Sequence, residues 1–438
     1  MSSSTGPEGR RDEGGVPEGA PPTGSIPLVD VEEAATPHWT PTSAAGPDDV
    51  VVVGAVRTPQ GRLRGALSTV PATQLAATAI RGALEQSGVP AEAVDAVILG
   101  QVLQAGAGQN PARQASLAAG IGMRAHTTTV NKVCLSGLTA VIDAARLLRS
   151  GEAEVVVAGG MESMSLAPHL LPGSRTGTAY GAIQMLDHMA HDGLTDAYEG
   201  ESMGTCTDRT TQERYGLTRE QQDEVAALSH QRAAAAWEEG RFKAFVVPVT
   251  VPGRKGDTVV DRDEGIRPET TVETLARLRP AFVPDGQITA GNSSPISDGA
   301  AALVVTTRRR AEESGWTVLA TVRAAGQVAG PDTALHSQPS AAIRTALERQ
   351  GWDVGDLDVI EINEAFGAVV AQSAADLGVP VSAVNTDGGG IALGHPIGAS
   401  GARLLVHAAH ALHARGGGRA AVGLCGGGGQ GEALLLEL

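Results

Sequence analysis

Two segments of this chain have the same unusual layout, in which an apolar strand runs directly into glycines. The first is Val155-Val156-Val157-Ala158-Gly159-Gly160, and the second is Ala420-Ala421-Val422-Gly423-Leu424-Cys425-Gly426-Gly427. Unbroken apolar runs are typical of strands that are buried on both faces of a sheet. We therefore predict a duplicated α/β unit, whose two copies pack face to face with a site between them.

Strands and helices alternate along both halves, which predicts parallel sheets with helices on their faces. In the first half we expect strands at 50–56, 94–99, 127–132 and 155–158, and helices at 71–86, 111–119 and 138–148. In the second half we expect strands at 318–325, 357–362, 420–425 and 433–436, and helices at 341–350, 366–377 and 403–414. Together these elements predict two copies of one α/β unit.

Between the halves the alternation stops. Pro, Gly and polar residues dominate the segment 168–291, which contains one clear helix (219–239) and a hairpin-like run (245–260). Because this segment is too long for an ordinary loop, we interpret it as an inserted, lid-like loop domain. The strand expected at 301–306 then returns to the first sheet. The first half therefore comprises 49–167 plus 292–312, and the second half comprises 313–438.

The first 48 residues differ in composition from the rest. Residues 1–49 hold nine acidic residues and two arginines, and the stretch is rich in Pro, Gly, Ser and Glu. Such a composition cannot bury enough apolar surface to offset chain entropy, so we predict a disordered acidic tail at 1–48. The net charge of −16 argues against nucleic-acid binding. No apolar run approaches the roughly 18 residues of a membrane span, and no secretory leader is evident, which indicates a cytoplasmic protein.

The chain has three cysteines, which lie far apart and belong to no CxxC pair. This arrangement favours neither a structural metal site nor a disulfide framework. Cys134 lies at a strand-to-helix turn, where a helix N-terminus would lower its thiol pKa and where free N–H groups could hold an oxyanion. Cys425 precedes four glycines, which would let a substrate approach bare backbone. Each could instead be a buried packing residue, and Cys206 has no context beyond packing.

His395 lies in the glycine-rich turn Gly394-His395-Pro396-Ile397-Gly398-Ala399-Ser400-Gly401. A turn histidine is more often structural than catalytic. One thiol beside a histidine would, however, suggest acyl transfer through a covalent intermediate. Two thiols with one histidine suggest that one thiol carries an acyl group while the other moves a proton.

These residues fall within motifs that resemble the thiolase family, and within it the acetyl-CoA acetyltransferases. The matching stretches are NKVCLSG (131–137), GGMESM (159–164), GRKGD (253–257), LRPAF (278–282), GNSS (291–294), NEAF (363–366), GHPIGASG (394–401) and CGGGG (425–429). Single stretches of this kind are weak indicators. Their occurrence in family order across roughly 50–438 is specific.

The resemblance implies a duplicated, thiolase-like α/β/α/β/α layered fold with an inserted loop domain, and it implies a role for each candidate residue. Cys134 would take the acyl group from acetyl-CoA, and His395 would activate it. Cys425 would abstract the α-proton of a second acetyl-CoA. Asn363 would hold a water beside His395 to form an oxyanion site for the enolate, while the N–H groups of Cys134 and Gly427 would form a second oxyanion site. Two such sites suit a Claisen condensation, in which charge develops on two oxygens. Acetyl-CoA, acetoacetyl-CoA and CoA would be substrates and products, and no cofactor or metal is implied.

The resemblance also implies how CoA is held. By position, Met203, Phe282 and Ser294 would line the pantetheine tunnel, and Arg254 and Lys255 could meet CoA phosphates. The alternatives are ordinary packing for the tunnel residues and a solvated charge pair for the two cations. The family further implies a homodimer or homotetramer.

Three departures from the family pattern affect the expected acyl-chain length. Residues 335–339 replace a Thr-Gly-Pro-type run, Ser202 stands where many acetoacetyl-CoA enzymes have histidine, and Pro295 stands where glycine is common. A 3-ketoacyl-CoA thiolase that acts on longer chains in fatty-acid β-oxidation is therefore the alternative function. A catalytically silent CoA-binding relative is a third possibility, which the intact cysteines and histidine disfavour.

Overall fold

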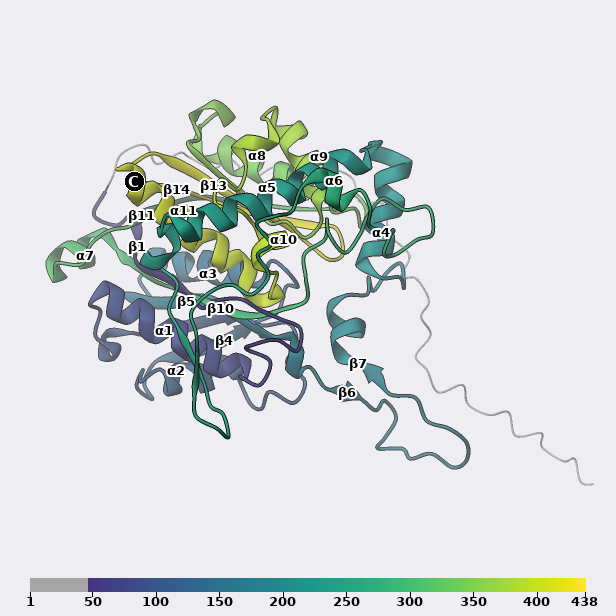
Figure 1. The fold of residues 1–438 in the computed structure, drawn as a ribbon. Helices are drawn as coiled ribbons and strands as arrows, with labels where there is room; N and C mark the ends of the chain where they lie inside the picture. The colour runs from purple at the N-terminus through teal and green to yellow at the C-terminus, as the bar shows by residue number, and fades with distance from the viewer. Residues whose placement is uncertain (1–45) are drawn as a thin grey trace, which may run out of the picture.

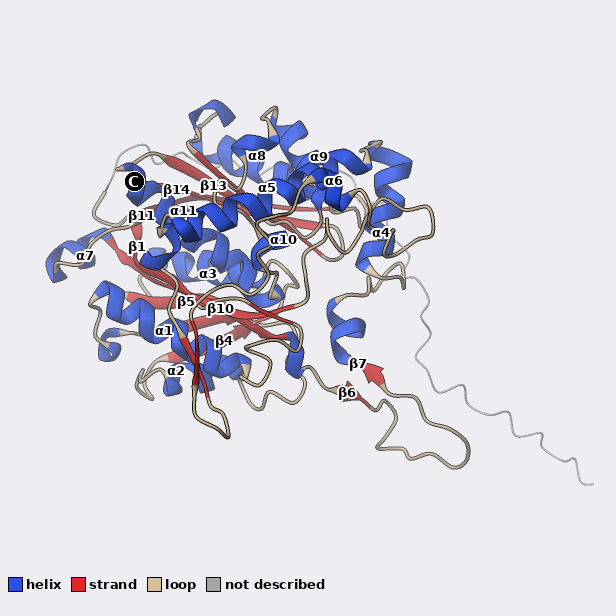
Figure 2. Ribbon diagram, viewed as in Figure 1, coloured by secondary structure: helices blue, strands red, loops and turns tan. Residues whose placement is uncertain are grey.

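The computed structural model describes residues 46–438, and it contains one long mixed sheet built from two copies of the same unit (Figures 1 and 2). The strands of the first half are β1 (Val50–Arg57), β3 (Ala96–Gly100), β4 (His126–Val130), β5 (Val155–Ser163) and β10 (Ser297–Thr307), and the two-residue β2 (Gly61–Arg62) pairs with β10. The strands of the second half are β11 (Ala320–Ala329), β12 (Val359–Ile362), β13 (Arg419–Gly426) and β14 (Gln430–Glu437).

The strand order demonstrates the duplication. It runs β1-β10-β5-β3-β4 in the first half and β11-β14-β13-β12 in the second. At the position that β4 occupies in the first half, the second half has an isolated β-bridge between Ile360 of β12 and Val384. The two halves meet through a short pairing of β1 with β11, which joins Val51 to Thr321 and Val52 to Ala320. The predicted duplication is thus confirmed.

The helices make up three layers around the two half-sheets. They are α1 (Ala72–Ser87), α2 (Pro111–Ala118) and α3 (Ser136–Ser150) in the first half, and α8 (Gln338–Gln350), α9 (Gly367–Leu377) and α11 (Ser400–Arg415) in the second. Helices α3 and α11 contact each other between the half-sheets, as Figure 1 shows. Their apolar faces, including Leu138, Val141, Leu404 and Leu405, belong to one buried cluster. Each such side chain contributes about 1.5–3 kcal/mol through burial.

The other helices cover the outer faces. Helices α1 and α2 pack on the first half-sheet, and α8 and α9 pack on the second. The result is the expected α/β/α/β/α order of layers. Three shorter helices complete the halves and their connections: α6 (Val272–Leu275), α7 (Arg308–Ser314) and α10 (Gly390–Leu393).

The prediction of purely parallel half-sheets was wrong. Parallel pairs are confined to β3 with β4 and β5, and to β12 with β13. β10 is antiparallel to both β1 and β5, and β14 is antiparallel to both β11 and β13. A tight turn joins β13 to β14, and such a turn permits only antiparallel pairing. The apolar runs did not reveal strand direction because these strands are buried on both faces in either case.

The segment between the halves is mainly irregular. It contains the small pairs β6 (His169–Leu170) with β7 (Leu186–Asp187) and β8 (Val249–Val251) with β9 (Thr258–Val260), together with α4 (Met203–Thr210) and α5 (Arg219–Glu238). A capping box at Thr218 starts α5, which packs against α9 and α10. The connection between β6 and β7 projects from the body of the molecule (Figure 1).

The predicted acidic tail falls mostly outside the described residues. The part that is described, 46–48, forms a turn next to β1, in which Asp49 N donates to Gly46 O at 3.0 Å. Within 46–438, no helix is long and apolar enough to cross a membrane. The same residues contain no group of three or more His, Cys, Asp or Glu side chains placed to hold a metal ion.

Candidate active site

Cys134 lies in a strained turn that we call the nucleophile turn, residues 131–136. Val133 has φ +51°, a left-handed conformation that is rare for a β-branched residue. The Ser136 hydroxyl holds this conformation, because it donates to Val133 O at 2.6 Å and accepts from Lys132 N at 2.8 Å. The Asn131 side chain also accepts from Val133 N at 3.1 Å. The turn therefore places Cys134 ahead of α3, which begins at Ser136.

His395 lies in a second turn, residues 394–400, which we call the histidine turn. Gly394 has φ +126°, which only glycine adopts readily. The carbonyl of Gly398 packs so closely on the first half that a Cβ on Gly160 would lie 1.9 Å from it, and a Cβ on Gly100 would lie 2.6 Å from it. The glycines of both halves thus let the two backbones meet.

A buried carboxylate fastens the histidine turn to the first half. Glu162, at the end of β5, accepts from Gly398 N at 2.9 Å, Val102 N at 3.0 Å and Leu103 N at 3.1 Å. Burial raises the pKa of Glu162 to about 7, although these three N–H groups favour its charged form. Glu162 on β5 therefore connects the histidine turn of the second half to the residues that follow β3 in the first half.

The two turns bring the imidazole of His395 to the thiol of Cys134. His395 Nε2 lies 3.3 Å from Cys134 Sγ, and Nδ1 lies 2.5 Å from Ser400 Oγ. The Ser400 hydroxyl donates its proton to Pro396 O at 3.0 Å, so it can only accept from the imidazole. This network assigns the proton of the neutral ring to Nδ1 and leaves the Nε2 lone pair facing the thiol.

Burial controls the charge of this pair. It raises the pKa of Cys134 to about 12, and the N–H groups of Cys134 and Gly427 offset only part of that rise. Burial, with the charge of Arg403 as a second cause, lowers the pKa of His395 to about 3. The resting pair is therefore a neutral thiol and a neutral imidazole. The sequence-based expectation of a lowered Cys134 pKa was wrong, because desolvation outweighs the helix N-terminus two residues away.

Cys425 and Asn363 complete the surroundings of the imidazole from the second half. Cys425 is fully buried at the end of β13, and burial raises its pKa. Asn363 follows β12, and its Nδ2 lies 3.5 Å from His395 Nε2. Gly427 begins the turn between β13 and β14, in which Gly428 and Gly429 have φ +78° and +68°. The four other predicted catalytic or oxyanion residues therefore come together around the imidazole of His395.

A pocket of about 350 Å³ opens onto these groups. Cys134, His395, Cys425 and Gly427 line it, and so do the predicted tunnel residues Met203, Phe282 and Ser294. The rest of its wall is mainly small and apolar: Val133, Ala190, Gly193, Leu194, Thr195, Ser202, Gly204, Ser293, Ile296, Leu335, Ala365, Phe366 and Ile397. Phe282 meets Phe366 edge to face, with 6.2 Å between ring centroids. The wall is suited to an apolar chain rather than to a charged group.

An outer cleft of about 740 Å³ adjoins this pocket and shares Phe282, Ser293, Ser294 and Ile296 with it. Arg62 and Arg267 supply positive charge to its lining. Arg254 and Lys255 instead lie exposed between β8 and β9 and line neither cavity. The structure therefore does not bring these two predicted cations to the site.

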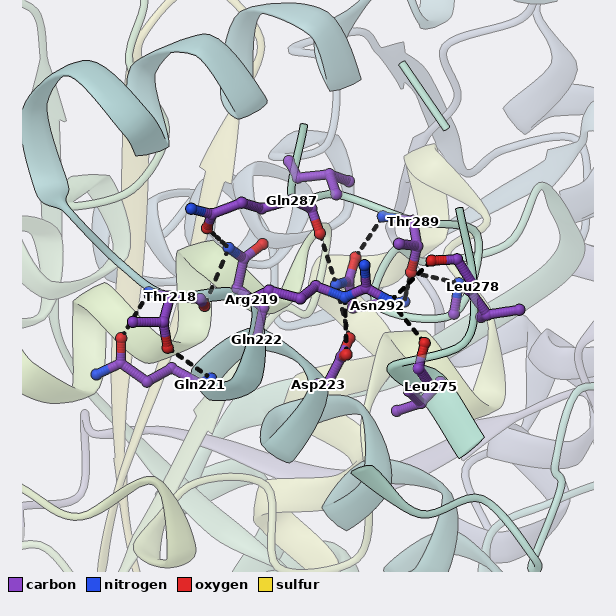
Figure 3. A network of polar contacts seen from close by, with 12 residues as sticks. Thr218, Arg219, Gln221, Gln222, Asp223, Leu275, Leu278, Gln287, Thr289 and Asn292 are labelled. Atoms are coloured by element: carbon purple, nitrogen blue, oxygen red, sulfur yellow. Dashed lines mark hydrogen bonds and ion pairs between the residues drawn. The ribbon is translucent and has the colours of Figure 1, made fainter. Parts of the chain in front are cut away.

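A polar network anchors the wall shared by the two cavities (Figure 3). The Asn292 amide donates to Asp223 Oδ1 at 2.9 Å and to Gln287 O at 3.1 Å, and its oxygen accepts from Thr289 N at 2.7 Å. Asp223 on α5 also pairs with Arg219 at 2.7 Å. Helix α5 of the inserted segment thus fixes the loop that carries Ser294.

Several contributing residues were not found from the sequence. Ser400 lies inside the histidine motif, five residues after the histidine and at the start of α11. Glu162 also lies within a matching stretch, but nothing in a single sequence shows which N–H groups it meets. Arg62 and Arg267 gave no signal, because isolated arginines are ordinary surface residues.

A duplicated five-layer fold with a thiol and an imidazole facing each other between its halves defines a class of thiol-dependent α/β enzymes. Two family descriptions match this chain: thiolase, N-terminal domain, over residues 50–309, and thiolase, C-terminal domain, over residues 316–438. The chain belongs to the thiolase family.

Individual relatives agree with this assignment. A probable acetyl-CoA acetyltransferase of Mycolicibacterium smegmatis is 55% identical over 389 residues, which cover 88% of this chain and 100% of that protein. The acetyl-CoA acetyltransferase of Pseudomonas aeruginosa is 50% identical, with 89% and 99% covered. The crystal structure of the Bacillus anthracis acetyl-CoA acetyltransferase superposes with a TM-score of 0.86 at 39% identity, covering 89% of this chain and 98% of that one.

Proposed function

We propose that this protein is an acetyl-CoA C-acetyltransferase, which reversibly condenses two acetyl-CoA molecules to acetoacetyl-CoA and CoA. The observation that carries the proposal is the 3.3 Å contact between His395 Nε2 and Cys134 Sγ, with Cys425 and Gly427 lining the same pocket. The names of the curated relatives support the choice of acetyl-CoA as substrate.

In the acylation step, His395 Nε2 takes the thiol proton of Cys134 as the sulfur attacks the thioester carbonyl of acetyl-CoA. The N–H groups of Cys134 and Gly427, both of which face the Cys134 sulfur, hold the developing oxyanion. The carbon–sulfur bond to CoA then breaks, and the imidazolium returns its proton to the departing CoA thiolate. The neutral resting pair suits this step, because charge develops only during the reaction.

In the condensation step, Cys425 passes its thiol proton to His395 Nε2, and the Cys425 thiolate then takes an α-proton from a second acetyl-CoA. The resulting enolate oxygen accepts from the Nε2–H of the His395 imidazolium and from a water that Asn363 holds. The enolate carbon attacks the acetyl group on Cys134, and the bond from that group to the Cys134 sulfur breaks. The imidazolium of His395 then returns its proton to the Cys134 thiolate, while the α-proton stays on Cys425 as its thiol proton. Burial raises the pKa of Cys425, so its thiolate is a strong base.

For CoA itself, we propose that the pantetheine arm passes Met203, Phe282 and Ser294, which line the inner pocket. The outer cleft would take the nucleotide end, with Arg62 and Arg267 as candidates to meet its phosphates. Arg254 and Lys255 would meet CoA only if the exposed β8–β9 connection moved. Alanine at Arg267 should therefore raise KM for acetyl-CoA more than alanine at Arg254.

A second candidate activity is thiolysis of longer 3-ketoacyl-CoA chains. The observation in its favour is the apolar pocket wall. Ser202 belongs to this wall, but its hydroxyl accepts from Thr205 N at 3.1 Å and caps α4. Thiolysis rates on acetoacetyl-CoA and on 3-ketoacyl-CoAs of increasing length decide between the two. A kcat/KM that rises with chain length would favour the longer substrates.

The division of labour between the cysteines is tested by two variants. Cys134→Ser should give no acyl-enzyme by mass spectrometry, and full thiolysis by this variant would refute the mechanism. Cys425→Ala should still acquire one acetyl group from acetyl-CoA but fail to condense. Cys206→Ala is the matched control, because Cys206 is buried on α4 and does not line the pocket.

We further propose a cytoplasmic homodimer or homotetramer. Strand β4 pairs only with β3 among the described strands, which leaves an edge for a second copy. The connection from β6 to β7 exposes Tyr180, Ile183 and Met185, which a partner could cover. Light scattering on the purified protein measures the oligomeric state.

A further inference from the structure

A buried carboxylate of the second half binds the nucleophile turn of the first. Glu432 lies on β14 and has no exposed side-chain surface. It accepts from Lys132 Nζ at 2.6 Å, from Thr139 Oγ1 at 2.6 Å and from Gln327 Nε2 at 2.5 Å. Lys132 is two residues from Cys134, and Thr139 lies on the helix that follows it. The contacts therefore span the boundary between the two halves.

The location of Glu432 ties this contact to the reaction. In the β13–β14 pair, Glu432 stands opposite Leu424, and the next pair is Gly431 with Cys425. The turn between these strands carries Gly427, whose N–H faces the Cys134 sulfur. Glu432, near the start of β14, thus binds the nucleophile turn. The turn between β13 and β14 supplies the Gly427 N–H as an oxyanion donor.

The nucleophile turn needs such an anchor. The left-handed conformation of Val133 is unfavourable for a β-branched residue, so the turn would relax if its neighbours did not hold it. The hydrogen bonds of Ser136 act within the turn. The Lys132–Glu432 ion pair instead fixes the turn relative to the other half of the molecule, which carries His395, Cys425 and Gly427.

We propose that Lys132 and Glu432 are positioning residues, which hold Cys134 in register with the imidazole and the Gly427 N–H across the boundary between the halves. Neither residue touches the reacting atoms in this role. The inference rests on the proposed acyl transfer through Cys134. It adds that acylation requires the Lys132–Glu432 ion pair to hold Cys134 in position.

The test separates position from stability. In Lys132→Met, Glu432 stays buried without its cation, and such a change is strongly destabilising. The double variant Lys132→Met/Glu432→Leu leaves no buried charge unpaired, so it should be more stable than Lys132→Met, even though Thr139 and Gln327 lose their shared acceptor. We expect the double variant to regain thermal stability while acylation of Cys134 by acetyl-CoA stays about 10- to 100-fold slower than wild type.

The readout is the pre-steady-state burst of CoA release. A loss of folded protein lowers the burst amplitude, whereas misplacement of Cys134 lowers the burst rate at full amplitude and unchanged KM. Lys132→Arg should restore most of the rate, since it keeps the cation. Arg415→Met is the control. It removes an exposed ion pair between Arg415, the last residue of α11, and Asp358.

A double variant that acylates at the wild-type rate overturns the inference. If the double variant does not fold, Glu432→Gln gives the same decision, because it keeps side-chain volume and a carbonyl for Thr139 while removing the charge. Wild-type protein without any burst would instead refute the proposed function, so the two failures are distinguishable.

Discussion

Replacing Ser400 by alanine should remove the contact that sets the tautomer of His395. The Ser400 hydroxyl accepts from His395 Nδ1 at 2.5 Å and donates to Pro396 O at 3.0 Å, in a site where all three residues are buried. Without it, Nδ1–H has no acceptor in this network, and leaving such a buried donor unpaired costs about 1–3 kcal/mol. The ring can avoid that cost by moving its proton to Nε2, and then it no longer faces Cys134 as a base.

The expected loss follows from that cost. A penalty of about 1–3 kcal/mol on the competent tautomer corresponds to a roughly 5- to 150-fold fall in the acylation rate, because about 1.4 kcal/mol is a factor of ten. KM for acetyl-CoA should stay near the wild-type value, since Ser400 does not line the pocket. Stopped-flow measurement of CoA release with a thiol reagent gives both quantities.

Two controls accompany this variant. Ser400→Thr keeps the hydroxyl and should retain most of the acylation rate. Ser340→Ala removes a buried helix-start hydroxyl that bonds Ser337 O at 2.9 Å and Asp376 at 2.7 Å, away from the pocket. An unchanged burst rate in folded Ser400→Ala would refute the tautomer assignment, because the geometry leaves Nδ1 no other role.

Three further outcomes are expected. Burial raises the pKa of Cys134 to about 12 and lowers that of His395 to about 3. The rate at which iodoacetamide alkylates Cys134 should therefore increase with pH throughout about pH 6 to 9. A plateau of this rate within that range would indicate a resting thiolate–imidazolium pair. Gly160→Ala would place a Cβ 1.9 Å from a carbonyl of the histidine turn, so it should lower both Tm and the acylation rate; a variant with wild-type Tm and rate would contradict the close packing. Asp263→Asn breaks a fully buried pair with Arg57 at 2.7 Å and should destabilise the protein by about 3–5 kcal/mol in chemical denaturation; a loss below about 1 kcal/mol would show that the pair is dispensable.

Much of the candidate site was accessible from sequence because its residues lie in compact motifs. Cys134, His395, Asn363 and Cys425 each stand in a short stretch that resembles a thiolase motif, and the structure brings all four together. The proposed phosphate contacts were not accessible in this way. Arg254 and Lys255 were chosen by motif alone, whereas the outer cleft draws Arg62 and Arg267 from segments without any local pattern.

The sequence by itself determined the duplication and the buried strands, because hydrophobic periodicity is a local property of the chain. Its motifs indicated the reacting groups through their resemblance to the thiolase family. Only the tertiary structure decided the charge of those groups. Desolvation depends on everything packed around an atom, and here it reverses the thiol pKa shift that the helix start alone would produce.

Tertiary structure likewise decided strand direction and the contacts of Glu162 and Glu432. These two buried carboxylates bind turns from the opposite half of the molecule, across separations of 236 and 300 residues. No local pattern encodes such contacts, since they exist only once the two halves have packed together. The nucleophile therefore comes from a motif, and its position relative to the imidazole comes from the fold.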